Sequence, residues 1–271
     1  MSRLIILFVF VFQVFGMLAQ STAGSMAEGR GGAALLSQDA WSAFNNQGSL
    51  AFQEDFAVGL WYRNRFMTEG MADQAIVAVL PVGKGSFGIT GQAFGNNLFR
   101  RSNAGLAYGM KISDKFGIGI RLGYQSIRIA EGYGSDGGVI VEGGFAYRMN
   151  DKLSIGVQLQ NANRDLISSE PEQRMPSILK GGLQYSFSEK VLLASEVWKA
   201  EDQDISVRVG LEYHPLENLF LVMGVHSEPS QMSFGFAWLI KVFRFDVSTS
   251  YHQVLGFTPQ LTLNYIANRS K

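Results

Sequence analysis

The feature that most constrains this chain is a repeated alternation of apolar and polar residues, which runs in short stretches from Glu54 to the end. In residues 117–124, isoleucine, leucine and tyrosine occupy the even positions, whereas glycine and arginine occupy the odd ones. Successive side chains of a β-strand point to opposite faces, so a period of two predicts strands with one apolar and one polar face. Fourteen such stretches predict strands near residues 54–65, 72–82, 85–95, 98–112, 116–130, 138–149, 152–162, 176–187, 190–199, 204–214, 218–227, 231–240, 243–252 and 258–267.

The connections between these stretches alternate in length. The even-numbered connections are tight turns, such as Gly83–Lys84 and Asn150–Asp151, whereas the odd-numbered ones are generally longer and more polar, above all Asn163–Met175. Outer-membrane barrels have short periplasmic turns, long external loops and an even number of strands. In a soluble β-sandwich, nothing requires odd-numbered connections to be longer than even-numbered ones. We therefore expect an all-β fold, a transmembrane antiparallel barrel of 14 strands in a bacterial outer membrane.

Aromatic residues support the same fold. If the first strand runs outward from the periplasm, eight aromatic side chains lie on the apolar face at the periplasmic ends of their strands. They are Phe116, Tyr147, Tyr185, Phe187, Tyr213, Trp238, Phe243 and Tyr265. Membrane barrels carry such a girdle at the interface with the lipid headgroups. Aromatic residues of an ordinary sandwich core need not share one end and one face.

The N-terminal residues indicate export. After Arg3, an apolar run from Leu4 to Leu18 leads into small residues, which predicts a secretory signal peptide that is cleaved after Ala19 or Ala23. The run is shorter than the roughly 20 apolar residues of a membrane-spanning helix. The chain is accordingly expected to comprise a signal peptide (1–20), an N-terminal segment (21–53) and a barrel (54–271).

Composition excludes several functions. The chain has no cysteine, so disulfides, thiolate metal sites and thiol nucleophiles are impossible. Lys+Arg and Asp+Glu number 23 each, and zero net charge gives no basic surface for nucleic acid. We expect no metal site and no cofactor.

Catalytic motifs are also weak. Gly132–Gly137 matches the dinucleotide fingerprint G-x-G-x-x-G, but it lies between two strands without the helix that binds phosphate, so we expect an external turn. The three histidines lack paired ligand spacing, and no G-x-S-x-G elbow is present. An enzyme is not expected. An outer-membrane hydrolase assembled from separate strands stays a minor alternative, with His226 and His252 as the positions to inspect.

The polar faces of the predicted strands should line the lumen of the barrel. Their charged residues are Arg121, Glu142, Arg148, Lys180, Glu196, Arg208, Glu212, Arg244 and Asp246. Five positive and four negative groups can pair with one another, whereas a selective ion pore more naturally shows a ring of one sign. We therefore expect a hydrogen-bonded interior that holds whatever fills it.

The segment before the first strand is a candidate for that filling. It contains Gly31-Gly32-Ala33, then Asp39 followed by small and aromatic residues, then Asn46-Gln47-Gly48 and a turn into Leu50. This order resembles the N-terminal hatch of the FadL-type barrels, and it is most similar to the PorV-like proteins of Bacteroidetes, outer-membrane components of the type IX secretion system. Family members usually carry Asn-Pro-Ala where this chain has Asn46-Gln47-Gly48.

The resemblance implies a plugged barrel. FadL-type proteins carry long-chain fatty acids or other hydrophobic molecules, with a kink in the wall for lateral exit, whereas PorV-like members handle secreted protein cargo. The expected partners are thus outer-membrane lipid and either a hydrophobic small molecule or secreted protein cargo, with no nucleic acid. The lumen residues are mostly glycine, glutamine and charge, which slightly disfavours fatty acids themselves.

Within the hatch, we expect Leu36, Ala40 and Phe44 to form one face of a short helix, because they are spaced by four residues. The Asp39 carboxylate should bond guanidinium groups of the lumen, namely those of Arg121, Arg148, Arg208 and Arg244. The residues expected to fix the hatch are Asp39, Trp41, Asn45 and Asn46. An unstructured periplasmic leader is the alternative.

Overall fold

A computed structural model of the 271-residue chain describes residues 22–130, 134–163, 176–201 and 203–267. The predicted signal peptide and most of the Asn163–Met175 connection lie outside these residues. Among the described residues, no helix is long and apolar enough to cross a membrane.

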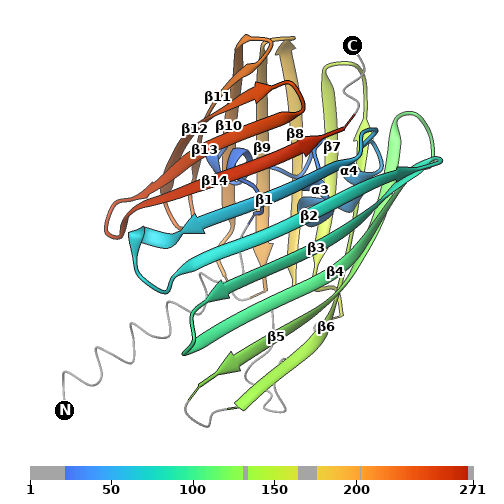
Figure 1. The fold of residues 1–271 in the computed structure, drawn as a ribbon. Coiled ribbons are helices and arrows are strands. Elements are labelled where there is room, and N and C mark those ends of the chain that lie inside the picture. The colour runs from blue at the N-terminus through green and yellow to red at the C-terminus, as the bar shows by residue number, and fades with distance from the viewer. Residues whose placement is uncertain (1–21, 131–133, 164–175, 202, 268–271) are drawn as a thin grey trace.

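Fourteen antiparallel strands form one closed barrel, in which β1 pairs with both β2 and β14 (Figure 1). This confirms the predicted all-β class and strand number. The strands are β1 Ala57–Asn64, β2 Ala72–Val82, β3 Gly85–Gly95, β4 Phe99–Lys111, β5 Phe116–Ile129, β6 Gly134–Arg148, β7 Leu153–Gln160, β8 Ile178–Ser188, β9 Val191–Ala200, β10 Ser206–Leu216, β11 Leu219–His226, β12 Gln231–Ile240, β13 Phe243–His252 and β14 Gly256–Ile266.

The predicted start of β6 is wrong. Residues 134–137 were expected in an external turn, but Gly134–Gly138 pair in register with Gln125–Ile129 of β5. Glycine, serine and aspartate carry no apolar period, so the alternation could not reveal this part of the strand. The formal G-x-G-x-x-G match therefore ends within a β-strand, where no helix follows it to bind a phosphate.

The two faces of the wall differ in exposure. In β1, Leu60 and Tyr62 are exposed, whereas Trp61 and Arg63 are buried. The same alternation holds in the other strands, and the exposed face carries leucine, isoleucine, valine and aromatic residues. On this face, aromatic residues contact one another near the tight turns, as Phe116 and Tyr147 do with ring centroids 6.2 Å apart. We call this end, where the even-numbered connections lie, the tight-turn end, and the opposite end the long-loop end.

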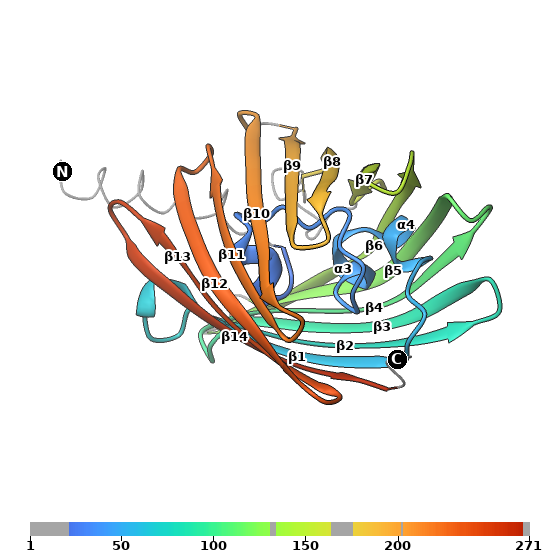
Figure 2. The ribbon, with the colours of Figure 1, turned by 90° about the horizontal axis from the view of Figure 1, so that it is seen from above.

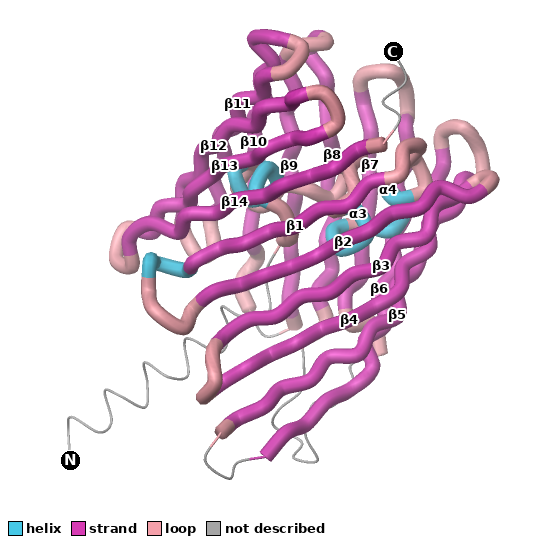
Figure 3. The backbone as a smooth tube through the Cα atoms, viewed as in Figure 1, coloured by secondary structure: helices cyan, strands magenta, loops and turns pink. Residues whose placement is uncertain are grey.

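The strands surround the N-terminal segment, defined here as residues 22–53 (Figure 2). It contains three short helices, α2 Ser25–Gly29, α3 Ser42–Asn45 and α4 Gln47–Leu50, and nearly all of its residues are buried. As Figure 3 shows, the only other helix among the described residues is the single turn η1 Arg65–Met67, between β1 and β2.

The helix expected over Leu36–Phe44 is wrong in extent. Only Ser42–Asn45 of this region is α-helical, and the preceding residues form turns. The backbone is extended at Asn46, with φ −169° and ψ 113°, so α3 ends there and α4 begins. The fit of the segment inside a narrow barrel overrides the local spacing, as tertiary contacts often do for short helices.

Candidate functional site

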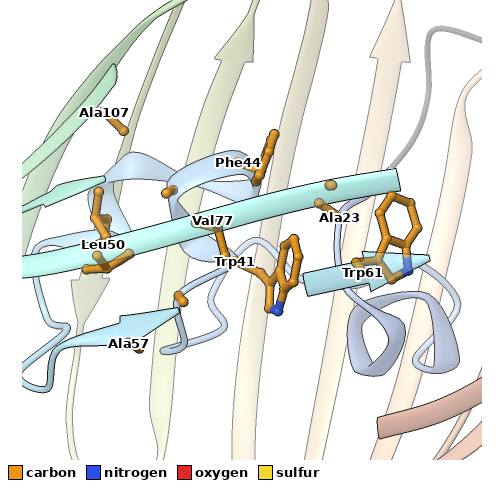
Figure 4. Close-up of a cluster of buried hydrophobic side chains, with 12 residues drawn as sticks. Ala23, Trp41, Phe44, Leu50, Ala57, Trp61, Val77 and Ala107 are labelled. Atoms are coloured by element: carbon orange, nitrogen blue, oxygen red, sulfur yellow. The ribbon is translucent and has the colours of Figure 1, made fainter. Parts of the chain in front are cut away.

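The N-terminal segment shares an apolar core with one side of the wall. Trp41 is 1% exposed and lies between Phe44 and Trp61, with ring centroids 6.0 and 6.4 Å away. Figure 4 shows these rings beside Leu50 and the strand residue Val77. Burial of side chains of this size contributes about 1.5–3 kcal/mol each, which holds the segment against β1 to β4.

Glycines of the wall make room for the segment elsewhere. A Cβ atom at Gly119 would lie 2.3 Å from the carbonyl oxygen of Gln47, and one at Gly109 would lie 2.5 Å from the same oxygen. In the opposite direction, a Cβ at Gly48 would lie 2.4 Å from the Cα of Phe145. Backbone packs directly on backbone here, so α4 fits only because both surfaces lack side chains.

We predict that Gly119→Val displaces α4 from the wall, because the new side chain has no space against the Gln47 backbone. The matched control is Gly181→Val, since nothing lies within 4 Å of a Cβ atom at Gly181. Hydrogen–deuterium exchange of the folded proteins, read by mass spectrometry, should be faster in peptides that contain Gln47–Leu50 for Gly119→Val than for the control. Equal exchange of these peptides in both variants would contradict this packing.

Carboxylates of the wall bind donors of the segment. Glu196 accepts hydrogen bonds from the backbone N–H of Leu35 at 2.6 Å and from Trp198 Nε1 at 2.7 Å. Glu212 forms an ion pair with Arg30 at 2.9 Å, and its other oxygen lies 2.6 Å from His214 Nε2. Charge-assisted hydrogen bonds of this kind are roughly twice as strong as neutral ones, so these carboxylates fix the middle of the segment.

The predicted hatch residues differ in their contacts. Asn46 has the most complete set, because its Nδ2 donates to the carbonyls of Leu35 and Phe145 at 2.9 and 3.1 Å while its Oδ1 accepts from Gly48 N–H at 2.9 Å. Asn45 bonds both the N–H and the carbonyl of Ala23, at 3.0 and 2.9 Å. Both asparagines thus join distant parts of the segment, and Asn46 also joins it to β6.

Trp41 and Asp39 face the tight-turn end of β13 and β14. Trp41 Nε1 donates to Asn264 Oδ1 at 2.9 Å, and Asn264 in turn donates to Asp246 at 2.9 Å. The nearest guanidinium to Asp39 is that of Arg244, at 3.8 Å, which is too long for a hydrogen bond. Asp246 is the closer partner of Arg244, at 2.8 Å.

Of the four arginines expected near Asp39, only Arg244 lies at ion-pair distance among the described residues, and no hydrogen bond joins the two. Arg121 instead pairs with Glu142 at 3.3 Å, and Arg148 donates to Gln38 at 2.9 Å while its guanidinium lies 4.0 Å from the Phe52 ring. The wall acids Glu196 and Glu212, which accept hydrogen bonds from the segment at 2.6 and 2.9 Å, hold it more closely than Asp39 does. These partners depend on the path of the chain inside the lumen, which residue spacing does not encode.

A further ion-pair cluster was not among the predicted sites. Asp73 of β2 accepts hydrogen bonds from Arg63 at 2.9 Å and from Arg65 at 2.7 Å, and Arg63 also pairs with Glu28 of α2 at 3.0 Å. Asp73 and Arg63 occupy the inward face of neighbouring strands and are opposite one another in register. The alternation pattern placed Arg63 on that face, but its partners became apparent only with strand pairing.

A hollow of 370 Å³ opens beneath the segment at the tight-turn end. It is lined by Asp39, Phe52 and Arg148, among others, and by Glu54 at its edge. Glu54 accepts a hydrogen bond from Lys111 Nζ at 2.9 Å, and this bond together with the lysine charge holds the pKa of Glu54 below its usual value. The hollow is a polar mouth of mixed charge.

Two buried cations of the lumen stand apart from the paired groups. Lys180 Nζ and the Arg208 guanidinium lie 3.7 and 3.4 Å from the ring centroid of Trp198, and their residues are only 1% and 3% exposed. Within the described part of the chain, neither cation has a carboxylate at ion-pair distance, and Arg208 Nε has no hydrogen-bond partner. Cation–π contact offsets part of their desolvation but leaves their N–H donors available.

The histidines named for the hydrolase alternative have structural contacts. His252 Nδ1 accepts the backbone N–H groups of Val254 and Leu255, both at 3.2 Å, which caps the turn before β14. His226 Nε2 lies 3.2 Å from Gln231 Oε1 across the β11–β12 hairpin. Among the described residues, no group of three or more His, Asp or Glu side chains could hold a metal ion.

Comparison with solved structures shows the fold. The barrel is similar to the Ralstonia pickettii toluene transporter TbuX, with a TM-score of 0.66 and 12% identity over 90% of this chain and 97% of that chain. A Pseudomonas aeruginosa FadL homologue gives a TM-score of 0.65 and 12% identity over 91% and 99% of the two chains. The Pseudomonas putida toluene transporter TodX gives a TM-score of 0.59 and 12% identity over 90% and 97%.

This chain therefore has the fold of these barrels, which are two toluene transporters and a FadL homologue. No protein-family model matches the sequence, and no curated protein does either. The PorV-like resemblance, Bacteroidetes as the source and the type IX secretion role stay predictions.

Proposed function

We propose that the protein is an outer-membrane transport barrel, whose lumen the N-terminal segment plugs and which passes a small molecule with an apolar body and an anionic head. Two observations support the outer-membrane location. Structural neighbours with the same fold include a transporter, and the outer face of the barrel carries exposed apolar residues, as a face toward lipid does. The buried cations Lys180 and Arg208 beside the Trp198 ring are the observation from which we infer a substrate with an anionic head. Secreted protein cargo has no specific contact in its favour.

A buried cation without an acid is costly, and no carboxylate of the described residues lies at ion-pair distance from Lys180 or Arg208. Lys180 and Arg208 keep donors beside an aromatic ring. Glu196, opposite Arg208 in register, already accepts from Leu35 N–H and Trp198 Nε1, and Glu212, Asp73, Glu142 and Asp246 are bound to Arg30, Arg63, Arg121 and Arg244. A carboxylate or sulfate head would offer both cations charge-assisted hydrogen bonds. The anion would thus give both cations the ion pair that the described residues do not give them.

The position of these cations suits a molecule that arrives from outside. Lys180 and Arg208 are each the third residue from the long-loop end of their strand, and the neighbouring Glu196 holds the Leu35 backbone of the segment. In outer-membrane barrels the long loops are external. An anionic head bound here would lie directly beside a contact that must open before the substrate passes.

Binding of one pair of probes tests the substrate class. In detergent solution, dodecanoate should bind the full-length protein more tightly than dodecanol, which has the same tail without the charge. Replacing both cations, Lys180→Gln with Arg208→Gln, should weaken dodecanoate binding about ten-fold to a hundred-fold, because charged hydrogen bonds contribute about 1.5–3 kcal/mol. Dodecanol binding should not change.

The matched control is Arg148→Gln, which removes a lumen cation at the other end of the barrel. It should leave dodecanoate affinity within experimental error of the unmodified protein. Equal affinity for the two probes, or equal losses in the double variant and the control, would contradict an anion site at Trp198. Uptake of radiolabelled dodecanoate into vesicles that contain the protein then tests transport itself.

A further inference from the structure

Two arginines face each other on the outer surface of the barrel. Arg100 of β4 is the direct cross-strand partner of Arg128 of β5, and both side chains are exposed. They lie on the outward face, because their neighbours Arg101 and Ile127 alternate with them and the inward Arg121 is buried on the same strand as Arg128. Like charges placed directly opposite destabilise a sheet unless another group neutralises them.

The described residues provide no such group. Neither Arg100 nor Arg128 has a hydrogen bond or an ion pair with any residue that the structure describes. The outward neighbours in the same row are Gly95 of β3 and Ser135 of β6, which carry no charge. The pair therefore forms a small cationic site without a counter-ion among the residues that the structure describes.

Residues below the pair change in polarity step by step toward the membrane. Outward positions of β4 and β5 pair as Arg100 with Arg128, Ser102 with Ser126, Ala104 with Tyr124 and Leu106 with Leu122. Tyr124, Leu106 and Leu122 are all more than half exposed on this face. The order from arginine through serine and tyrosine to leucine matches that of a membrane interface, from lipid headgroup to acyl chain.

The dimensions agree with one lipid molecule. Six residues separate Arg100 from Leu106, which is about 20 Å along the strand at roughly 3.3 Å per residue. Strands of such barrels are tilted by about 45°, so the arginines lie roughly 14 Å above the leucines along the membrane normal. The long-loop ends of β4 and β5 are their lower ends in Figure 1.

We propose that Arg100 and Arg128 bind the phosphate of an outer-leaflet lipid headgroup whose acyl chains lie along Leu106 and Leu122. Two guanidinium groups match the geometry of a phosphate, and their mutual repulsion becomes attraction once a dianion lies between them. The hydroxyls of Ser102 and Ser126 supply further donors one step closer to the membrane. The leucines beneath the site favour a lipid over free phosphate. This inference rests on the outer-membrane location in the proposed function, but not on transport.

The test uses the full chain in a mild detergent, with lipid A as the probe that carries phosphate monoesters and a net negative charge, and phosphatidylcholine as a zwitterionic lipid without net charge. Native mass spectrometry should show lipid A retained on the protein. Arg100→Gln with Arg128→Gln should lower its apparent affinity at least ten-fold, because two charge-assisted contacts are lost. Lys199→Gln is the matched control, since Lys199 is an exposed cation at the long-loop end of β9 that bonds only the Gln203 carbonyl among described residues.

Three results would overturn the proposal. They are equal retention of lipid A by the double variant and the unmodified protein, equal retention of phosphatidylcholine, and complete displacement of lipid A by millimolar inorganic phosphate. The last would indicate a simple anion site. Dodecanoate binding at Trp198 should survive in the double variant, so a failed lipid site and a failed transport site give different results.

Discussion

Val209→Arg is expected to reduce folding into lipid vesicles far more than Arg208→Val does, although the two positions are adjacent. Val209 pairs with the exposed Val225, on the outward face of β10 and β11, whereas Arg208 is buried on the inward face. An arginine near the middle of the membrane on the lipid face of a barrel costs about 2–4 kcal/mol. Removal of Arg208 leaves no buried carboxylate without its partner, because no carboxylate of the described residues forms an ion pair with Arg208.

The measurement is the fraction of folded protein, read from heat-modifiable migration in gels, after dilution from urea into vesicles. The Val209→Arg sample should fold poorly and unfold at lower urea concentration. The Arg208→Val sample should remain close to the unmodified protein in both respects. Equal folding defects in the two variants would contradict the assignment of Val209 to the lipid face and Arg208 to the lumen face of β10.

The strands could be predicted from the sequence because each has one face toward an apolar environment. Four of them, β2, β3, β12 and β13, begin and end at the predicted residues. The start of β6 was missed at residues 134–137, where this contrast disappears. Backbone hydrogen bonds hold that stretch in the sheet, and they do not require apolar and polar residues to alternate in the sequence.

The inside of the barrel was harder to predict, since a partner in the lumen depends on register and on the route of the N-terminal segment. Lys180 and Arg208 were predicted on the inward face. Their shared contact with the Trp198 ring depends on strand pairing, which places Lys180 opposite Trp198 across β8 and β9. Asp39 was expected to bond several arginines, and Asp246 turned out to be the closer partner of Arg244. Composition gives the charges of a lumen, but not their pairs.

For the N-terminal segment, the structure shows polar contacts at Asn46 but not the expected helix. Its polar residues were expected to anchor it, and Asn46 does bond two segments of the chain and β6. The spacing of Leu36, Ala40 and Phe44 was misleading, because helix α3 covers only Ser42–Asn45 and ends at the extended Asn46. A short helix has little stability of its own, so its packing inside the barrel decides its length.

Deletion of residues 24–49 is expected to open the barrel without destroying it. The pairing of β1 with β14, over Ala57–Arg63 and Gln260–Ile266, does not involve the deleted residues, so the wall can still close. Both predicted signal-peptide cleavage sites are retained. The vacated lumen would expose polar residues such as Gln158 and Asn264, which water can solvate. The loss of Trp41 and Phe44 from the core should lower stability, but not change the fold.

Single-channel conductance in planar bilayers tests the proposed plug most directly. The full-length protein should conduct little, because its N-terminal segment fills the lumen, and the variant that lacks residues 24–49 should show steps several times larger at the same voltage and salt. Heat-modifiable migration of both samples confirms that each is folded. Indistinguishable conductance of two folded samples would contradict a plugged barrel, and with it the proposal that the segment controls passage.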